Sequence, residues 1–312
     1  MRIRELIDFM SDLTLKTGYP VPVPKDFAYK WATNLNFSRK GKKILYTGAL
    51  YQLIPYIEAL SIYLKAMESS DEGAYLALRF TRNIPGSLIN SIIKPEPSLI
   101  EWSNRVLLNI ANLLLKSKIE FSYLYDKDVY SGVLLYDMGA EEKFEIHAKN
   151  VFNILKESGA EEIITVDPHT TFILKNIYPK YIKEFNFDVK SYLELINNEG
   201  EIKKDGETIT IHDSCIYARG LSIIERPRSL LSNKGFIIKE ANRNKKLTSC
   251  CGGPVEAIFP SLSNAIARNR VKELSSVSNE IVTMCPICYI NLKKVSKDYN
   301  STIYDISELL LR

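Results

Sequence analysis

The chain repeats part of itself at a fixed distance, and this repeat restricts the fold more than any other feature of the sequence. Residues 163–175 have the sequence IITVDPHTTFILK, and they align with residues 281–293, IVTMCPICYINLK, at an offset of 118. In this alignment Asp167 corresponds to Cys285. Similarity at one constant offset indicates two copies of the same structural unit.

Each copy has the pattern of alternating strands and helices. Short apolar segments, beginning near Lys43 in the first copy and near Thr208 in the second, are followed by amphipathic stretches of roughly 10–15 residues. The copies also end alike, with YLELI at residues 192–196 and ISELL at residues 306–310. Because alternating strands and helices favour parallel sheets, we predict an α/β protein of two tandem domains related by a pseudo-twofold.

Three segments follow from this pattern. Residues 1–38 are predicted to form an N-terminal helix and a proline-rich extended segment. Residues 39–198 form the first domain, with a helical insertion at about 72–128, and residues 207–312 form the second. The polar run 197–206 between the domains is rich in turn-forming residues and is the predicted linker.

Composition excludes several classes of protein. With 46% hydrophobic and 25% charged residues the chain is globular, and a formal net charge of +4 with no long basic block argues against nucleic-acid binding. No apolar run reaches the ~18 residues of a membrane helix, and the first residues lack a signal-peptide pattern. We therefore predict a cytoplasmic protein without a transmembrane segment, associated with a membrane-bound complex only through partners.

All the cysteines lie in the second copy, and the first 214 residues contain none. The five are Cys215, Cys250, Cys251, Cys285 and Cys288. An odd number without an export signal argues against a disulfide framework and favours metal or redox chemistry. Each group of cysteines follows a predicted strand, and ligands of open α/β sheets bind at that edge.

The vicinal pair Cys250–Cys251 precedes Gly252 and Gly253. Adjacent cysteines do not easily bind one tetrahedral ion, but they reach neighbouring irons of a cluster. The two glycines allow the backbone to approach inorganic sulfides and to donate N–H groups to them. A tetrahedral zinc takes four thiolates and leaves one over, whereas thiolates are the natural ligands of iron–sulfur clusters. A structural zinc site with four cysteine ligands remains the alternative.

Several motifs surround these cysteines: HDSC (212–215), RG (219–220), ERPRSLL (225–231), SCCGGP (249–254) and CPICY (285–289). With the spacing of all five cysteines, they resemble the cysteine-rich CCG domain found in a subunit of heterodisulfide reductase. The same domain occurs in iron–sulfur subunits of glycolate, lactate and glycerol-3-phosphate oxidation systems and of some archaeal succinate dehydrogenases. From Gly18 to Leu310 the chain is similar to a tandem of two such domains.

The resemblance implies that the five cysteines bind one [4Fe–4S] cluster. In heterodisulfide reductase this cluster is of a non-cubane kind and works directly on a disulfide; for the present chain the cubane form stays open. Two departures from the family pattern are evident. Ile216 stands where family members often have histidine, and the first copy has Ala49, the Tyr136–Asp137 region, Asp167 and Thr170 roughly where ligands would be expected. We therefore expect no cluster in the first copy.

Other residues are candidates for accessory roles. Asp167 and His169 occupy the position of the CxxC loop in the first copy, where they are suited to metal binding or proton transfer. His212 lies three residues before Cys215, and arginines follow that cysteine at Arg219, Arg226 and Arg228. The arginines are suited to stabilising a negatively charged cluster or binding an anionic substrate. Polar loop residues, a structural histidine and a solvated helix face are the alternatives.

Together these features predict an iron–sulfur subunit of a heterodisulfide-reductase-like oxidoreductase complex, with one cluster for electron transfer and with thiol/disulfide redox chemistry as a further activity. The expected partners are a ferredoxin-like iron–sulfur or flavoprotein subunit, and the expected substrate class is a disulfide or thiol. One alternative is an electron-relay subunit of a flavin-linked 2-hydroxy acid, glycerol-3-phosphate or succinate dehydrogenase. Another is a zinc-stabilised interaction subunit without catalysis.

Overall fold

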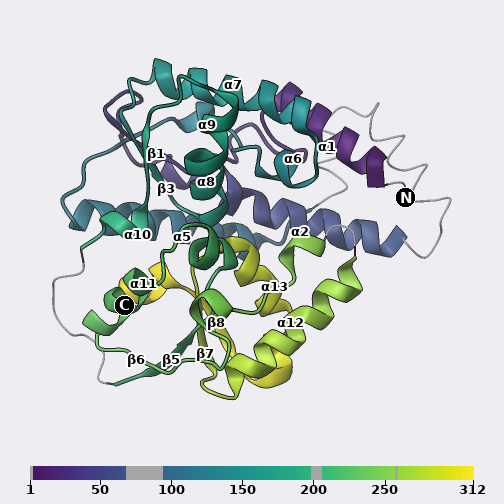
Figure 1. Ribbon diagram of the computed structural model, residues 1–312, viewed down its shortest axis with the longest axis vertical. Coiled ribbons are helices and arrows are strands. Elements are labelled where there is room, and N and C mark those ends of the chain that lie inside the picture. The colour runs from purple at the N-terminus through teal and green to yellow at the C-terminus, as the bar shows by residue number, and fades with distance from the viewer. Residues whose placement is uncertain (1–2, 68–93, 198–205, 257–258) are drawn as a thin grey trace. The chain divides into compact units, whose positions relative to one another are not determined.

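The computed structural model describes residues 3–67, 94–197, 206–256 and 259–312 (Figure 1). The chain divides into two compact units. The described residues of the first unit come from 1–105, 121–165 and 173–189, and those of the second come from 106–120, 166–172 and 190–312. The short segment 166–172, which contains Asp167 and His169, therefore belongs to the second unit. The domain boundaries derived from the sequence stay a prediction.

The first sheet has four strands in the order β2-β1-β3-β4. Their bounds are β1 (Lys43–Tyr46), β2 (Ser122–Tyr123), β3 (Glu162–Thr165) and β4 (Asp188–Ser191). Strand β1 pairs in parallel with both β2 and β3. Side chains such as Ile44 and Ile163 are fully buried, as expected for a parallel sheet covered on both faces.

The described residues of the first copy also form helices, some of which belong to the second unit. They are α1 (Ile3–Thr17), α2 (Leu50–Met67), α5 (Pro97–Lys116), α6 (Val133–Asp137), α7 (Glu141–Glu157), α8 (Pro168–Phe172), α9 (Tyr178–Tyr181) and α10 (Tyr192–Leu195). Helix α1 occupies the expected N-terminal helix and packs against α7, where Lys143 forms an ion pair with Asp12 at 2.7 Å. Helix α5 occupies the helical part of the expected insertion, of which residues 72–93 lie outside the described ranges.

The second sheet has the same topology as the first, with the order β6-β5-β7-β8. Its strands are β5 (Thr208–Ile211), β6 (Ile237–Ile238), β7 (Glu280–Thr283) and β8 (Thr302–Asp305), and all three pairings are parallel. The predicted α/β class with two parallel sheets is therefore confirmed. The pseudo-twofold relation of the halves stays a prediction.

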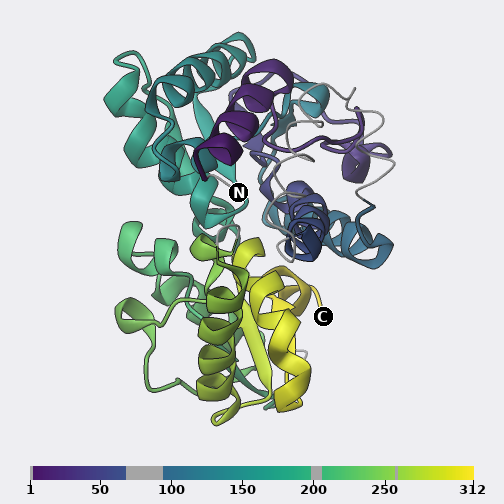
Figure 2. The same cartoon turned by 90° about the vertical axis from the view of Figure 1, so that its right-hand side faces the viewer.

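Four helices accompany the second sheet: α11 (Glu225–Asn233), α12 (Pro260–Ser275), α13 (Pro286–Ser296) and α14 (Ile306–Leu310). Helix α12 packs against α13, and α11 packs against α14. The connection from β5 to β6 runs in the opposite direction across the sheet from the two later connections. Because such crossovers are right-handed, α11 covers one face while α12 and α13 cover the other (Figures 1 and 2).

The last helix of each copy begins with the same local structure. The backbone N–H of Ser191 donates to the Glu194 carboxylate at 2.8 Å, and that of Asp305 donates to the Glu308 carboxylate at 3.0 Å. The side chains of Ser191 and Asp305 accept a backbone N–H in return, which completes a capping box in both copies. The similarity of the two terminal segments in sequence therefore reflects one helix-start motif used twice.

None of the helices within the described ranges combines the length and the apolar composition needed to span a bilayer.

A buried carboxyl in the first unit gives a pH-dependent stability. Asp128 is 0% exposed, and its Oδ2 accepts hydrogen bonds from the hydroxyl and the N–H of Thr47 at 2.5 and 3.4 Å. Burial raises the pKa of Asp128 to about 7, whereas the unfolded chain has a pKa near 3.9. Between these values only the folded protein holds the proton, so stability falls as pH rises from about 4 to about 7. Asp128→Asn should remove this loss, on the order of 4 kcal/mol at pH 8.

Tryptophan fluorescence is a suitable signal, because both tryptophans of the chain, Trp31 and Trp102, lie in the first unit. Urea unfolding from pH 4 to pH 8 should show a flatter profile for the variant than for the wild type. The control is Asp126→Asn, since Asp126 is exposed and its hydrogen bond with Arg39 lowers its pKa. The prediction would be contradicted if the free energy of unfolding of the wild type did not fall, relative to that of Asp128→Asn, between pH 4 and pH 8.

Candidate metal centre

The five cysteines come from three loops at the carboxyl edge of the second sheet. Cys215 lies four residues after the end of β5, and Cys285 follows β7, the neighbouring strand, with Cys288 in the first turn of α13. Cys250 and Cys251 lie in the loop between β6 and α12, immediately after the short helical turn Lys245–Leu247. Parallel strands thus bring cysteines that are up to 73 residues apart in the sequence to one edge.

All five side chains are free thiols. Cys251, Cys285 and Cys288 are buried, and Cys215 and Cys250 are partly exposed. Cys251 is hydrogen-bonded to both Cys250 and Cys288, and Cys288 is also hydrogen-bonded to Cys285. Cys215 interacts electrostatically with Cys285 and Cys251. The structure therefore gathers all five predicted ligands into one group.

The pKa values within this group diverge. Hydrogen bonds from Cys250 and then Cys288 lower the pKa of the Cys251 thiol well below its usual value. Burial opposes ionisation of Cys285, but hydrogen bonds from Cys288 and His169 outweigh it and lower the pKa of Cys285 to about 5. The thiolate is the form of cysteine that binds metals, so two buried sulfurs are prepared for ligation.

The two glycines after the vicinal pair are required by the geometry of the loop. Gly252 has a φ of +91°, and a Cβ there would lie 2.5 Å from the carbonyl oxygen of Ser263. A Cβ on Gly253 would lie 2.2 Å from Ile287 Cγ2 and 3.5 Å from Cys251 Sγ. The N–H of Gly252 donates to Cys250 Sγ at 3.3 Å. The loop therefore brings the backbone N–H of Gly252 close to sulfur, as suits a sulfur-rich cluster.

The donor set fits an iron–sulfur cluster better than a single zinc ion. Five thiols form one group, whereas a tetrahedral zinc binds four ligands. A ring nitrogen of His212 also lies among them: it and the sulfurs of Cys251 and Cys288 are all within 4.8 Å of one another. When bound, an iron–sulfur cluster supplies one-electron transfer.

Asp167 and His169 lie beside these cysteines, within the second unit. Oδ1 of the fully buried Asp167 accepts the backbone N–H groups of His169 at 2.8 Å and Thr170 at 2.9 Å, at the start of α8. The His169 side chain is hydrogen-bonded to Cys285. Burial raises the pKa of Asp167 to about 6. The segment that lacks cysteines in the first copy thus packs against the CxxC segment of the second.

The arginines after Cys215 have different surroundings. Arg219 is exposed and donates to the carbonyl oxygens of Thr248 at 3.0 Å and Lys246 at 3.4 Å. These hydrogen bonds stabilise the loop that leads to Cys250. Its positive charge lowers the pKa of Cys215, although burial has the larger effect and raises it overall. Arg219 therefore lies close enough to Cys215 to act on its charge, and its role beside a cluster stays a prediction.

Arg226 and Arg228 form hydrogen bonds that link structural elements of the second unit. Arg226 donates to the carbonyl oxygens of Leu193, at 3.1 Å, and Ile196 at the end of α10. The Arg228 side chain is 8% exposed and makes a two-point contact with Asp213 at 2.8 and 2.9 Å. A solvated helix face, one of the sequence-based alternatives, is therefore wrong for Arg228.

The sequence analysis missed Arg270, which holds His212. The Arg270 side chain is 0% exposed, and its Nε donates to His212 Nδ1 at 3.0 Å. The sequence contains a signal for the burial of this arginine, because Ala267, Arg270, Val271 and Leu274 have the i, i+3, i+4, i+7 spacing of one buried helix face. An arginine on such a face indicates a buried partner.

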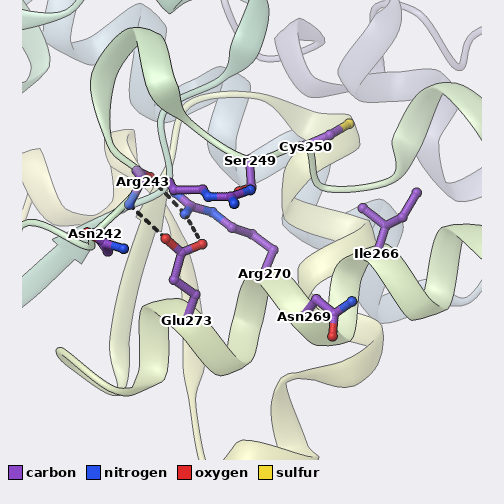
Figure 3. Close-up of a pocket in the computed structure, with 8 residues that line it drawn as sticks. All are labelled: Asn242, Arg243, Ser249, Cys250, Ile266, Asn269, Arg270 and Glu273. Atoms are coloured by element: carbon purple, nitrogen blue, oxygen red, sulfur yellow. Dashed lines mark hydrogen bonds and ion pairs between the residues drawn. The ribbon is translucent and has the colours of Figure 1, made fainter.

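A surface pocket of about 410 Å³ lies between the Cys250 loop and α12. Figure 3 shows Arg270 and Glu273 in this pocket, and the sulfur of Cys250 pointing away from both. The pocket therefore borders the loop that carries Cys250.

The fold and site define an α/β protein with a group of five thiols at the carboxyl edge of a parallel sheet. Residues 209–293 match the family of cysteine-rich domains of the CCG type, so this segment is a CCG-type cysteine-rich domain. The match spans β5 to α13 and contains all five cysteines. The resemblance seen in the sequence is thereby confirmed.

Several curated relatives are named as oxidoreductases or as subunits of oxidoreductases. The chain is 28% identical over 226 residues to the probable iron–sulfur-binding oxidoreductase FadF of Bacillus subtilis, covering 67% of this chain and 31% of the relative. It is 27% identical over 224 residues to the EtfAB:quinone oxidoreductase of Syntrophomonas wolfei, covering 64% and 31%. To one subunit of the dihydromethanophenazine:CoB–CoM heterodisulfide reductase of Methanosarcina mazei it is 27% identical over 216 residues, covering 64% and 53%.

The chain thus spans about a third of the first two relatives and about half of the third. The cysteine-rich domain and the iron–sulfur-binding relative together indicate an iron–sulfur cluster.

Proposed function

We propose that the chain is an iron–sulfur subunit of a heterodisulfide-reductase-like oxidoreductase complex. It holds one [4Fe–4S] cluster, of the cubane or the non-cubane form, through Cys215, Cys250, Cys251, Cys285 and Cys288. The observation that supports this most strongly is the gathering of five free thiols from three loops at one edge of the second sheet.

The burial of the cysteines suggests how the site is used. Cys251, Cys285 and Cys288 lie on the inner side, where water is excluded, and Cys215 and Cys250 are partly exposed. A disulfide or thiol substrate, or an electron-transfer partner, approaches from the exposed side. The proposed partners are a ferredoxin-like iron–sulfur or flavoprotein subunit, and a cytoplasmic location stays part of the proposal.

An electron relay without a substrate of its own is the second candidate. It is favoured by the first copy, where Asp167 and Thr170 stand in place of the two cysteines of the CxxC motif, so that this loop offers no second thiolate site. The similarity to an EtfAB:quinone oxidoreductase is in line with a flavin-linked dehydrogenase as the electron source. The two functions differ in one assay: only the first lets the cluster-loaded protein reduce a disulfide, given an electron donor such as reduced methyl viologen.

Metal analysis of anaerobically purified protein tests the proposal. We expect about four irons and an equal amount of sulfide per chain, with a brown colour that dithionite bleaches. Iron and sulfide are measured chemically and zinc by mass spectrometry of the same sample. One zinc per chain without iron would contradict the proposal and favour the zinc-stabilised interaction subunit.

A further inference from the structure

We propose that His212 is a positioning residue that donates a hydrogen bond to the sulfur of Cys251 and raises the reduction potential of the cluster. Arg270 holds its imidazole in the one tautomer that can donate in this direction, so His212 is not itself a ligand. This inference rests on the iron–sulfur site proposed above.

The tautomer follows from the partner of Nδ1. His212 is 1% exposed, and its Nδ1 receives the Nε–H of Arg270 at 3.0 Å. A guanidinium group has only donors and stays protonated in proteins, so Nδ1 must be the acceptor and carries no proton. In a neutral imidazole the proton is then on Nε2.

The second ring nitrogen faces the cysteines. Nε2 of His212 is buried and forms no hydrogen bond among the described residues, although a ring nitrogen of His212 lies within 4.8 Å of the sulfurs of Cys251 and Cys288. His212 also contributes to lowering the pKa of the Cys251 thiol. A buried donor without a partner costs roughly 1–3 kcal/mol. We infer that Nε2–H donates to the sulfur of Cys251 when the cluster is bound.

Arg270 is itself fixed from several directions. Its Nη1 donates to Glu273 Oε2 at 2.7 Å and to the carbonyl oxygen of Arg243 at 2.9 Å, and Nη2 donates to Thr248 Oγ1 at 3.3 Å. Figure 3 shows the contacts with Glu273 and Arg243. The guanidinium group therefore cannot turn away from His212 without breaking these hydrogen bonds.

The consequence is electrostatic. A hydrogen bond to a ligating cysteine sulfur stabilises the more negative, reduced state of an iron–sulfur cluster, and hydrogen bonds to sulfur are among the factors that set its potential. A metal bond from Nε2 would need the lone pair that its proton occupies. The row of hydrogen bonds from Glu273 through Arg270 to His212 thus acts on the cluster through Cys251.

The test compares His212→Ala with His212→Gln. Both variants should retain the iron and sulfide of the wild type. His212→Ala should have a lower midpoint potential in a redox titration followed by electron paramagnetic resonance. His212→Gln should recover part of the difference, because its amide N–H can donate to the same sulfur. In the wild type, pulsed resonance spectra should show an exchangeable proton and no strongly coupled nitrogen.

The control is His147→Gln, which changes the other buried histidine; its Nε2 lies 2.6 Å from the carbonyl oxygen of Tyr130 in the first unit, and its substitution should leave the potential unchanged. Glu273→Gln should lower the potential less than His212→Ala, because it loosens Arg270 without touching the cysteines. A directly coordinated nitrogen in the wild type, or an unchanged potential in an iron-loaded His212→Ala, would overturn the inference. A wild type without iron would overturn the proposed function and the inference together.

Discussion

Cys251→Ala is expected to abolish cluster binding, leaving a colourless protein with almost no iron or sulfide. Cys251 is 3% exposed and occupies the centre of the group, with hydrogen bonds to Cys250 and Cys288. Alanine has no ligand atom, and no water can enter so enclosed a position at low cost to replace the sulfur. Iron and sulfide content and the visible absorption of anaerobically purified protein measure the effect.

Ser249→Ala, two residues before Cys251, is the matched control and should keep the full iron content. The same substitution can be made at each of the other four cysteines. If all five thiolates bind the cluster, each of these single-cysteine variants should bind iron more weakly than the wild type. A tetrahedral zinc site would leave one of the five variants with unchanged metal content. A Cys251→Ala protein that retains all its iron would show that this sulfur is not a ligand.

Arg228→Met is expected to destabilise the second unit by about 3–5 kcal/mol, since it leaves the charge of a buried carboxylate without its partner. The side chain of Asp213 is 3% exposed and receives two hydrogen bonds from Arg228. Asp213 also accepts the backbone N–H of Lys245 at 2.6 Å, so it links the end of β5 to the loop before Cys250. The substitution should therefore loosen that loop as well.

Hydrogen exchange measured by mass spectrometry on peptides covering β5 and the loop 245–251 can detect this change. The control is Arg268→Met, because the Arg268–Asp298 ion pair has side chains that are 52% and 51% exposed. Exposed pairs of this kind contribute about 0–1 kcal/mol, so exchange should change little in the control. Equal exchange in both variants would contradict the assigned role of Arg228.

The sheet topology was predictable from the sequence because the repeat preserves the order of its elements. Strands β3 and β7 begin at Glu162 and Glu280, which differ by the same offset of 118 as the aligned segments. The five cysteines were also predictable as a group, because parallel strands place their carboxyl ends at one edge. Both predictions depend on patterns that repeat along the chain.

The contacts of other side chains with the cysteines were harder to predict from the sequence. Arg270 and His212 are 58 residues apart, and His169 and Cys285 are 116 apart, so no local pattern links the members of either pair. Arg228 sits on a short helix whose mean polarity suggests exposure, and its burial depends on Asp213, 15 residues earlier. Polar pairing across a fold depends on side-chain directions that periodicity does not encode.

The turn at Asp167 shows what one residue change at this position does to a helix start. Asp167 caps α8 with its own carboxylate, whereas Cys285, at the corresponding position before α13, makes no capping hydrogen bond with its side chain. An aspartate at this position therefore satisfies backbone N–H groups of the first turn, and a cysteine leaves its sulfur available for other partners. A single substitution thus exchanges a helix cap for a thiol, so the two copies cannot have both at this position.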